Sequence, residues 1–187
     1  CMLLSFTDAF AKKKKKKAKA KPVTTATTKS KKDSVIKKPV LIDFESAESK
    51  TDNTSDVDGL LWFAKQQLGT PYKYASADPK NGGLDCSGFL YYVFQHFKIS
   101  VPRSSKDYMN FGKTIDKQKA QKGDVIVFTG TDSNTKVGGH VGLILENNGG
   151  NITFIHGSSG KANGVTISKL SEGYYSQRFL KIVRVIK

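Results

Sequence analysis

The sequence Gly82-Gly83-Leu84-Asp85-Cys86-Ser87-Gly88-Phe89-Leu90 places a cysteine where a glycine-rich loop turns into an apolar stretch that continues to Phe97. This pattern predicts a helix over about residues 86–97, with Asp85 at its start. A helix N-terminus favours the thiolate, which is the nucleophilic form of cysteine, by lowering the thiol pKa. Cys86 is therefore a candidate nucleophile, and Gly88 is expected to leave room for a substrate backbone.

Two histidines lie downstream in separate apolar segments typical of β-strands. His140 lies in Gly139-His140-Val141-Gly142-Leu143-Ile144-Leu145, and His156 lies in Ile152-Thr153-Phe154-Ile155-His156-Gly157. A cysteine, a basic imidazole and a further residue that orients the base form the arrangement of papain-like hydrolases. The remaining histidine, His96, would lie on the cysteine helix about 15 Å along the axis from Cys86, and we expect it to be a surface or capping residue.

The folded part is expected to span residues 56–187. A helix is predicted over residues 59–68, capped by Asp58 and closed by Gly69. Short β-rich segments follow the cysteine helix at residues 124–128, 141–145, 152–156, 164–167 and 179–186. This order predicts an α+β fold in which N-terminal helices, including the nucleophile helix, pack on a mostly antiparallel β-sheet.

The N-terminal part of the chain has a different composition. Of the formal net charge of +15, residues 1–39 contribute most, with 13 lysines against two acidic residues. Residues 12–55 are therefore expected to be a flexible lysine-rich linker, with the apolar run at residues 40–44 packing loosely on the domain. Because no aromatic residues are interleaved with its lysines and no nucleic-acid motif is present, we expect an anionic wall or membrane surface as the partner of the linker, and no nucleic acid.

The first residues resemble the rear part of a secretory signal. Residues 1–11 form a short apolar run that ends in Ala9-Phe10-Ala11, a small-x-small cleavage pattern. The alternative is that Cys1 is a lipidated first residue. No run of about 20 apolar residues is present, so no membrane-spanning segment is predicted. Export to the cell envelope, either the periplasm or the wall, is the expectation.

Seven short motifs occur in one order within residues 59–186: residues 68–72, 82–89, 101–105, 123–128, 139–143, 154–158 and 174–175. Together they resemble the NlpC/P60 family, papain-like cysteine peptidases that cut the stem peptides of bacterial peptidoglycan. The loops at residues 74–81 and 130–139 are longer than in the family pattern, which leaves the details of substrate recognition open.

The resemblance implies a role for each matching residue. Cys86 would be the nucleophile, His140 the general base and His156 the residue that orients the base. Tyr72 would lend its hydroxyl to the oxyanion site beside the backbone N–H of Cys86, and core packing is the alternative role for Tyr72.

Two further residues, Ser87 and Arg103, are predicted near the oxyanion or substrate-binding site. Ser87 would lie in the first turn of the helix. Asp85 is expected either to cap that helix or to pair with Arg103. No metal or other cofactor is expected, because no Cys/His cluster has the spacing of zinc ligands.

The predicted function is that of a secreted peptidoglycan hydrolase. It would cleave the bond between the γ-carboxyl of D-glutamate and the following diamino acid through a Cys86 acyl-enzyme. Two alternatives remain: an amidase of related fold that cuts between the sugar and the stem peptide, and a non-catalytic wall-binding module.

Overall fold

The computed structural model describes residues 53–186. The predicted signal remnant, the apolar run at residues 40–44 and the linker up to residue 52 lie outside the described residues. Within the described part, no helix combines the length and the apolar character needed to cross a membrane.

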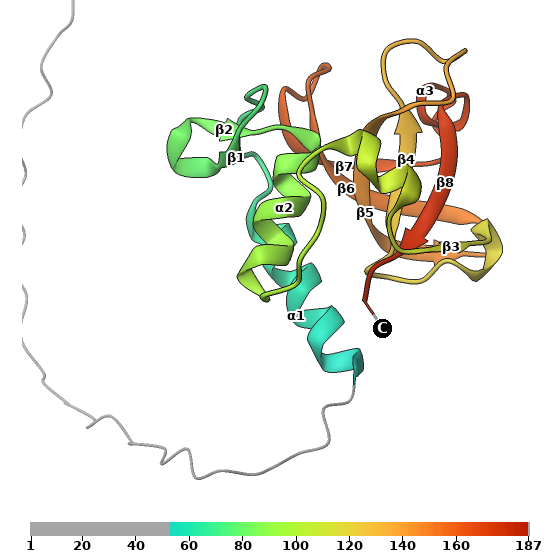
Figure 1. Ribbon diagram of the computed structural model, residues 1–187, viewed down its shortest axis with the longest axis horizontal. Coiled ribbons are helices and arrows are strands. Elements are labelled where there is room, and N and C mark those ends of the chain that lie inside the picture. Colours follow the sequence, from blue (N-terminus) through green and yellow to red (C-terminus); the bar gives the residue numbers. More distant parts are fainter. Residues whose placement is uncertain (1–52, 187) are drawn as a thin grey trace, which may run out of the picture. The chain divides into compact units, whose positions relative to one another are not determined.

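A six-stranded antiparallel sheet forms the centre of the described part (Figure 1). Its strand order is β3-β8-β4-β5-β6-β7. The strands are β3 Lys113–Ile115, β4 Val125–Thr129, β5 Gly138–Asn148, β6 Asn151–Ser158, β7 Gly164–Lys169 and β8 Phe179–Arg184. A separate two-stranded ribbon pairs β1 Ala77–Asp78 with β2 Gly83–Leu84, directly before the nucleophile helix.

Two helices, α1 Asn53–Gln66 and α2 Cys86–His96, lie on one side of the sheet (Figure 1). The helix α2 rests against β5 and β6, the strands that carry the two histidines of interest. On the other face, α3 Gly173–Ser176 packs against the sheet. Three 3-10 helices complete the connections: η1 Pro79–Asn81, η2 Ser105–Asn110 and η3 Lys117–Lys119.

Strand β4 shows why both faces of the sheet are covered. All five of its residues are buried, and successive side chains point to opposite faces. Val125 and Val127 belong to the core beneath α1 and α2, whereas Ile126 and Phe128 belong to the core beneath α3. A continuous apolar strand is thus the sequence signal of a sheet with two covered faces. The prediction of an α+β fold with helices on a mostly antiparallel sheet is confirmed.

The start of α1 differs from the prediction. The helix begins at Asn53, and Asp58 lies inside it instead of capping it. The Asp58 carboxylate instead accepts a hydrogen bond of 2.5 Å from Lys122 Nζ, a residue far away in sequence. Gly69 follows the helix with φ of +82°, which agrees with its predicted role in ending it.

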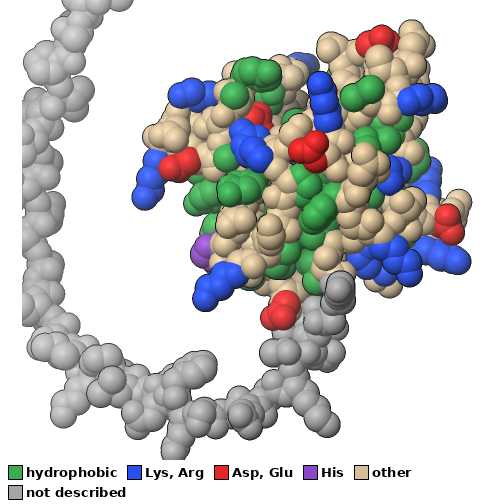
Figure 2. Space-filling model, viewed as in Figure 1, with side chains coloured by type: hydrophobic (Ala, Val, Ile, Leu, Met, Phe, Trp, Pro, Cys, Tyr) green, Lys and Arg blue, Asp and Glu red, His purple; other side chains and the backbone are tan. Residues whose placement is uncertain are grey.

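The surface of the described part shows no single basic face in the available view. Figure 2 shows Lys and Arg side chains at several separate places, with acidic and apolar side chains between them. In the sequence, residues 1–39 carry +11 of the formal net charge of +15.

Candidate active site

Cys86 is the first residue of α2, and the preceding residue fixes its backbone. Asp85 has an extended backbone conformation, and its Oδ1 accepts a hydrogen bond of 2.6 Å from the Gly88 N–H. This N-cap satisfies one of the N–H groups that the first helical turn leaves without an intrahelical partner. The cap therefore holds the cysteine at the N-terminal end of the helix.

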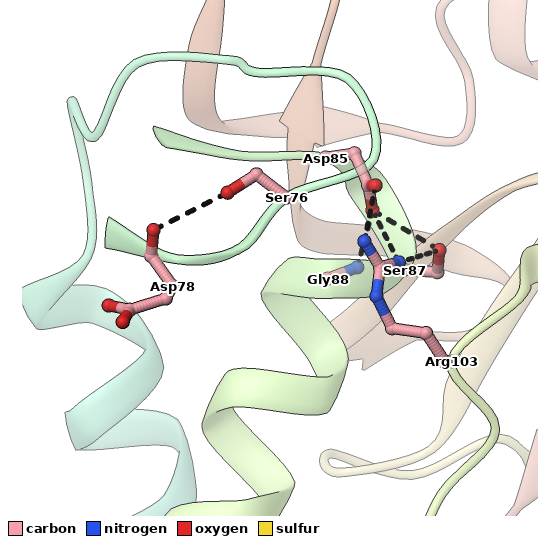
Figure 3. A network of polar contacts seen from close by, with 6 residues as sticks. All are labelled: Ser76, Asp78, Asp85, Ser87, Gly88 and Arg103. Carbon is pink, nitrogen blue, oxygen red and sulfur yellow. Dashed lines mark hydrogen bonds and ion pairs between the residues drawn. The ribbon is translucent and has the colours of Figure 1, made fainter. Parts of the chain in front are cut away.

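The Asp85 carboxylate is also the centre of a polar network at the start of α2 (Figure 3). Arg103 Nη2 lies 2.7 Å from Asp85 Oδ2, and Arg103 Nη1 lies 3.0 Å from Asp85 Oδ1. Ser87 Oγ donates to Asp85 Oδ1 at 3.2 Å and accepts from Arg103 Nη1 at 3.1 Å. Asp85 thus caps the helix and pairs with Arg103 at the same time.

The glycine after the cysteine serves the fold and not the substrate. A Cβ at Gly88 would lie 2.0 Å from the carbonyl oxygen of Ser76. That carbonyl accepts a hydrogen bond of 3.0 Å from the Asp85 N–H, which fixes it against the helix. The expectation that Gly88 makes room for a substrate backbone is therefore wrong, because the chain itself fills the space.

The neighbouring strands β5 and β6 bring His140 and His156 together. His140 Nε2 lies 2.9 Å from His156 Nδ1. The two rings are nearly perpendicular, at 89°, with centroids 4.8 Å apart. Phe128 packs beside His140, and Phe154 packs beside His156. Since Nε2 of His140 is engaged, Nδ1 is the ring nitrogen that remains to accept a proton.

A cavity of about 760 Å³ is lined by Cys86, His140 and Tyr72. His156 is fully buried behind His140. Ser87 and Arg103, in contrast, do not line this cavity and are held at Asp85. The structure thus brings three of the predicted site residues to one cavity, places a fourth behind the base, and places the other two under the start of α2.

The protonation states of Cys86 and His140 follow from their burial. Burial raises the pKa of the Cys86 thiol, and the Asp85 carboxylate raises it further. Hydrogen bonds from backbone N–H groups, first that of Val141, oppose this rise in the thiol pKa. Burial lowers the pKa of His140 to about 4. Desolvation therefore outweighs the expected effect of the helix N-terminus, and the resting pair is a neutral thiol and a neutral imidazole.

Tyr72 is held at the cavity by backbone contacts. Its N–H donates to the Asn163 carbonyl at 3.0 Å, and it forms an isolated bridge with Leu84. Burial raises the pKa of the Tyr72 phenol, as do the negative charges of the Cys86 thiolate and Asp85. The phenol is therefore a protonated donor. The Cys86 backbone N–H, at the first position of α2, has no intrahelical acceptor and is a second donor.

Several residues of the cavity wall were not predicted from the sequence. Ser168 Oγ lies 3.1 Å and Tyr175 Oη lies 3.2 Å from His156 Nε2. Arg178 lies with its guanidinium carbon 3.9 Å from the ring centroid of Tyr174. The Tyr174-Tyr175 pair was a recognisable motif, but no sequence signal connects Ser168 or Arg178 to the site.

The remaining histidine is remote from this cavity, as predicted. His96 is exposed at the end of α2, and its ring stacks on Phe63 with centroids 3.9 Å apart and an interplanar angle of 5°. Among residues 53–186, no group of three or more His, Cys, Asp and Glu side chains is placed to hold a metal ion.

Comparison with known proteins identifies relatives over the region that contains this site. The murein DD-endopeptidase MepS/murein LD-carboxypeptidase of Escherichia coli is 31% identical over 119 residues, which are 63% of this chain and 57% of the relative. The gamma-DL-glutamyl hydrolase of Bacillus subtilis is 35% identical over 123 residues, which are 65% of this chain and 27% of the relative. The matched region thus spans about half of the Escherichia coli relative and about a quarter of the Bacillus subtilis relative.

The fold and the sequence agree on the family. A crystal structure of an NlpC/P60 family protein from Bacillus cereus superimposes with a TM-score of 0.62 at 28% identity, covering 70% of this chain and 40% of that one. The sequence profile of the NlpC/P60 family matches residues 69–184, which include the cysteine, both histidines of the pair and Tyr72. The chain therefore belongs to the NlpC/P60 family.

Proposed function

We propose that this protein is a cysteine peptidase that hydrolyses stem peptides of peptidoglycan. The observation that carries the proposal is the placement of Cys86 and His140 at one cavity, with His140 hydrogen-bonded to His156. The relatives support the substrate class, since one is named a murein endopeptidase and another a gamma-DL-glutamyl hydrolase.

The first chemical step is attack on the scissile carbonyl carbon. Cys86 Sγ forms the new C–S bond while its proton passes to His140 Nδ1. Because both groups are neutral at rest, the proton moves as the substrate is attacked and not before. The developing oxyanion accepts hydrogen bonds from the Cys86 N–H and the Tyr72 hydroxyl. His140, now protonated, gives its proton to the leaving amine as the C–N bond breaks.

The second step is hydrolysis of the thioester. A water molecule enters the cavity, His140 Nδ1 takes its proton, and the resulting hydroxide attacks the acyl carbon. The C–S bond then breaks, the sulfur recovers the proton from His140, and the product acid leaves. His156 stays neutral through both steps, because burial, together with the adjacent His140, lowers its pKa to about 3.

Within the stem peptide, the bond between the γ-carboxyl of D-glutamate and the diamino acid is the proposed target. The name of the Bacillus subtilis relative supports a γ-glutamyl specificity. The name of the Escherichia coli relative favours a second candidate, a bond between two D-centres in a cross-link. The two bonds give different fragments and are therefore separable.

The setting and the domain arrangement are part of the same proposal. Residues 56–187 would be the catalytic unit and residues 12–55 a lysine-rich tether to an anionic wall or membrane, in a protein exported to the cell envelope. The charge of the tether is the supporting observation. Deleting residues 12–52 should weaken binding to insoluble sacculi at low salt and spare turnover of soluble stem peptides. Equal binding by the truncated protein at low salt would contradict the tether.

The test of the activity is digestion of purified peptidoglycan, with the fragments identified by mass. Wild type and His96→Ala should release stem-peptide fragments, whereas Cys86→Ala and His140→Ala should release none while remaining folded. Disaccharide-dipeptides would identify the γ-glutamyl bond, and conversion of cross-linked dimers to intact monomers would identify the D,D bond. Release of whole stem peptides would identify an amidase. An active Cys86→Ala protein would refute cysteine catalysis.

A further inference from the structure

A line of hydrogen-bonding groups runs from His140 through the buried ring of His156 to two further side chains of the cavity wall. It begins at His140 and passes to His156 through the 2.9 Å contact between Nε2 and Nδ1. From His156 Nε2 it reaches Ser168 Oγ at 3.1 Å and Tyr175 Oη at 3.2 Å. The strand β7 supplies Ser168 and α3 supplies Tyr175, so separate segments of the chain converge on one imidazole.

The position of each hydrogen along this line determines whether His140 can act as a base. A neutral imidazole has one N–H and one acceptor nitrogen. His140 accepts a proton at Nδ1 only if its own hydrogen is on Nε2. That N–H must then be donated to Nδ1 of His156, which must be without a hydrogen. The hydrogen of His156 is consequently on Nε2, where Ser168 and Tyr175 are its acceptors within the described part of the chain.

The positions of the Ser168 and Tyr175 hydroxyls fit a hydrogen on Nε2 of His156 better than a hydrogen on its Nδ1. Two oxygens lie at almost equal distances from Nε2, which suits one N–H shared between two acceptors. A bare ring nitrogen has one in-plane lone pair and would take only one hydroxyl hydrogen. Burial raises the pKa of Tyr175, while hydrogen bonds from the Ser168 and Ser158 side chains lower it. Each hydroxyl has one hydrogen and two lone pairs, so both oxygens can accept from His156 Nε2 while their own hydrogens point elsewhere.

We propose that Ser168 and Tyr175 are positioning residues that hold the hydrogen of His156 on Nε2, and thereby keep Nδ1 of His140 open to the Cys86 proton. This inference rests on the proposed function for its link to catalysis. The hydrogen position itself is a property of the folded protein and exists with or without a substrate.

The reverse tautomer would disable the base. With the hydroxyl oxygens removed, an N–H at Nε2 of His156 would be buried without an acceptor, because this ring is fully buried. The hydrogen would move to Nδ1, which would then donate to Nε2 of His140. His140 would in turn carry its hydrogen on Nδ1 and could not accept the thiol proton there.

The first experiment measures turnover of a soluble stem peptide by the full chain. Ser168→Ala and Tyr175→Phe each leave one acceptor, so we expect each to lower kcat less than about 10-fold. The double variant is expected to lower kcat by about 10- to 100-fold, with a smaller change in KM. The double variant Ser168→Thr/Tyr175→Phe should have the kcat of Tyr175→Phe alone, because threonine supplies the hydroxyl oxygen that alanine lacks.

Matched controls carry the same chemical changes elsewhere. Ser176 is an exposed serine of α3 that donates to the Gly173 carbonyl. Tyr92 lies on α2 and packs beside Phe63 of α1. The double control Ser176→Ala/Tyr92→Phe should keep wild-type kcat. A double Ser168/Tyr175 variant that is folded and retains the kcat of this control would overturn the proposal.

The second experiment reads the tautomer directly and needs no activity. In ¹⁵N NMR of the ring nitrogens of His156, the wild type should show a protonated Nε2 and an unprotonated Nδ1. The double variant should shift toward protonated Nδ1, and Tyr175→Phe, which preserves the aromatic packing, should shift partway. A wild type with its hydrogen on Nδ1, or a folded double variant with unchanged signals, would overturn the proposal. If these shifts occur in a protein that cleaves no peptidoglycan, the proposed function fails and the positioning role stands.

Discussion

Replacement of Asp85 should separate two roles of its carboxylate, the cap of α2 and the negative charge beside Cys86. Asp85→Asn keeps an oxygen that can accept from the Gly88 N–H, and Asn is about as good an N-cap as Asp. Asp85→Ala removes both the cap and the charge. Because the carboxylate contributes to the raised pKa of the Cys86 thiol, both variants should lower that pKa. Asp85→Asn should do so with the helix start intact.

The expected loss of stability follows from the contacts of Asp85. Loss of an N-cap costs about 1 kcal/mol. The ion pair joins an Asp85 side chain that is 9% exposed to an Arg103 side chain that is 39% exposed. Since the guanidinium keeps its access to water, we assign the pair about 1–2 kcal/mol, between the values for exposed and buried pairs. Asp85→Ala should therefore cost about 2–3 kcal/mol and Asp85→Asn about 1–2 kcal/mol.

These free energies correspond to measurable shifts in Tm. At about 3 °C per kcal/mol for a domain of this size, Tm should fall by about 6–9 °C in Asp85→Ala and by about 3–6 °C in Asp85→Asn. Thermal unfolding followed by circular dichroism gives these values. The thiol pKa is obtained from the rate of iodoacetamide alkylation across the pH range in which thiols titrate, with Cys1→Ser making Cys86 the only thiol in the chain.

The matched variant is Arg103→Gln, which removes the opposite charge. The Cys86 thiolate contributes to the raised pKa of Arg103, so the guanidinium in turn favours the thiolate. Arg103→Gln should therefore raise the thiol pKa where Asp85→Asn lowers it. The reasoning is refuted if Asp85→Asn melts as low as Asp85→Ala, or if its thiol titrates at or above the wild-type pH.

Three further predictions concern the histidines and the glycine of the site. His156→Ala should lose most of the activity yet retain more than Cys86→Ala. His156→Asn should recover part of the lost activity, because an amide oxygen can accept the His140 N–H. Equal inactivity of His156→Ala and His156→Asn in a peptide turnover assay would mean that an imidazole is required. Gly88→Ala should destabilise the fold by about 3 kcal/mol or more, because its Cβ would lie 2.0 Å from the Ser76 oxygen, and an unchanged melting curve would contradict this. The pKa values of His140, about 4, and His156, about 3, lie below that of an exposed histidine. Below about pH 6.5 the unfolded chain therefore binds more protons than the folded one. The free energy of unfolding should fall as the pH drops from there toward about 4, by up to about 2.7 kcal/mol per pH unit for the two histidines together. Denaturant unfolding at several pH values should show a shallower slope for His156→Asn than for the wild type, and identical slopes would argue against a buried neutral imidazole.

The sequence alone determined the elements whose signals are local. The apolar stretch after Asp85 predicted α2 with boundaries close to those observed. The apolar segments around His140 and His156 predicted β5 and β6, but β5 extends three residues beyond the predicted segment 141–145 at each end. Local patterns predict such elements because helix capping and strand burial depend on residues near one another in the chain. The strand β3 was missed, since Lys113–Ile115 is a short edge strand without a buried face. The motif order was enough to suggest the family, which the profile match confirmed.

Only the tertiary structure decided how these elements act on one another. Asp58 did not cap α1, because the helix begins at Asn53, and its carboxylate pairs instead with Lys122 from a segment distant in sequence. The space beside Gly88 is filled by the Ser76 backbone. Ser168 and Tyr175 reach His156 only after β7 has paired with β6 and α3 has packed on the sheet. The thiol pKa rises because desolvation in the assembled core outweighs the helix end. Each of these outcomes depends on burial or on contacts between distant segments, and these quantities exist only once the chain has folded.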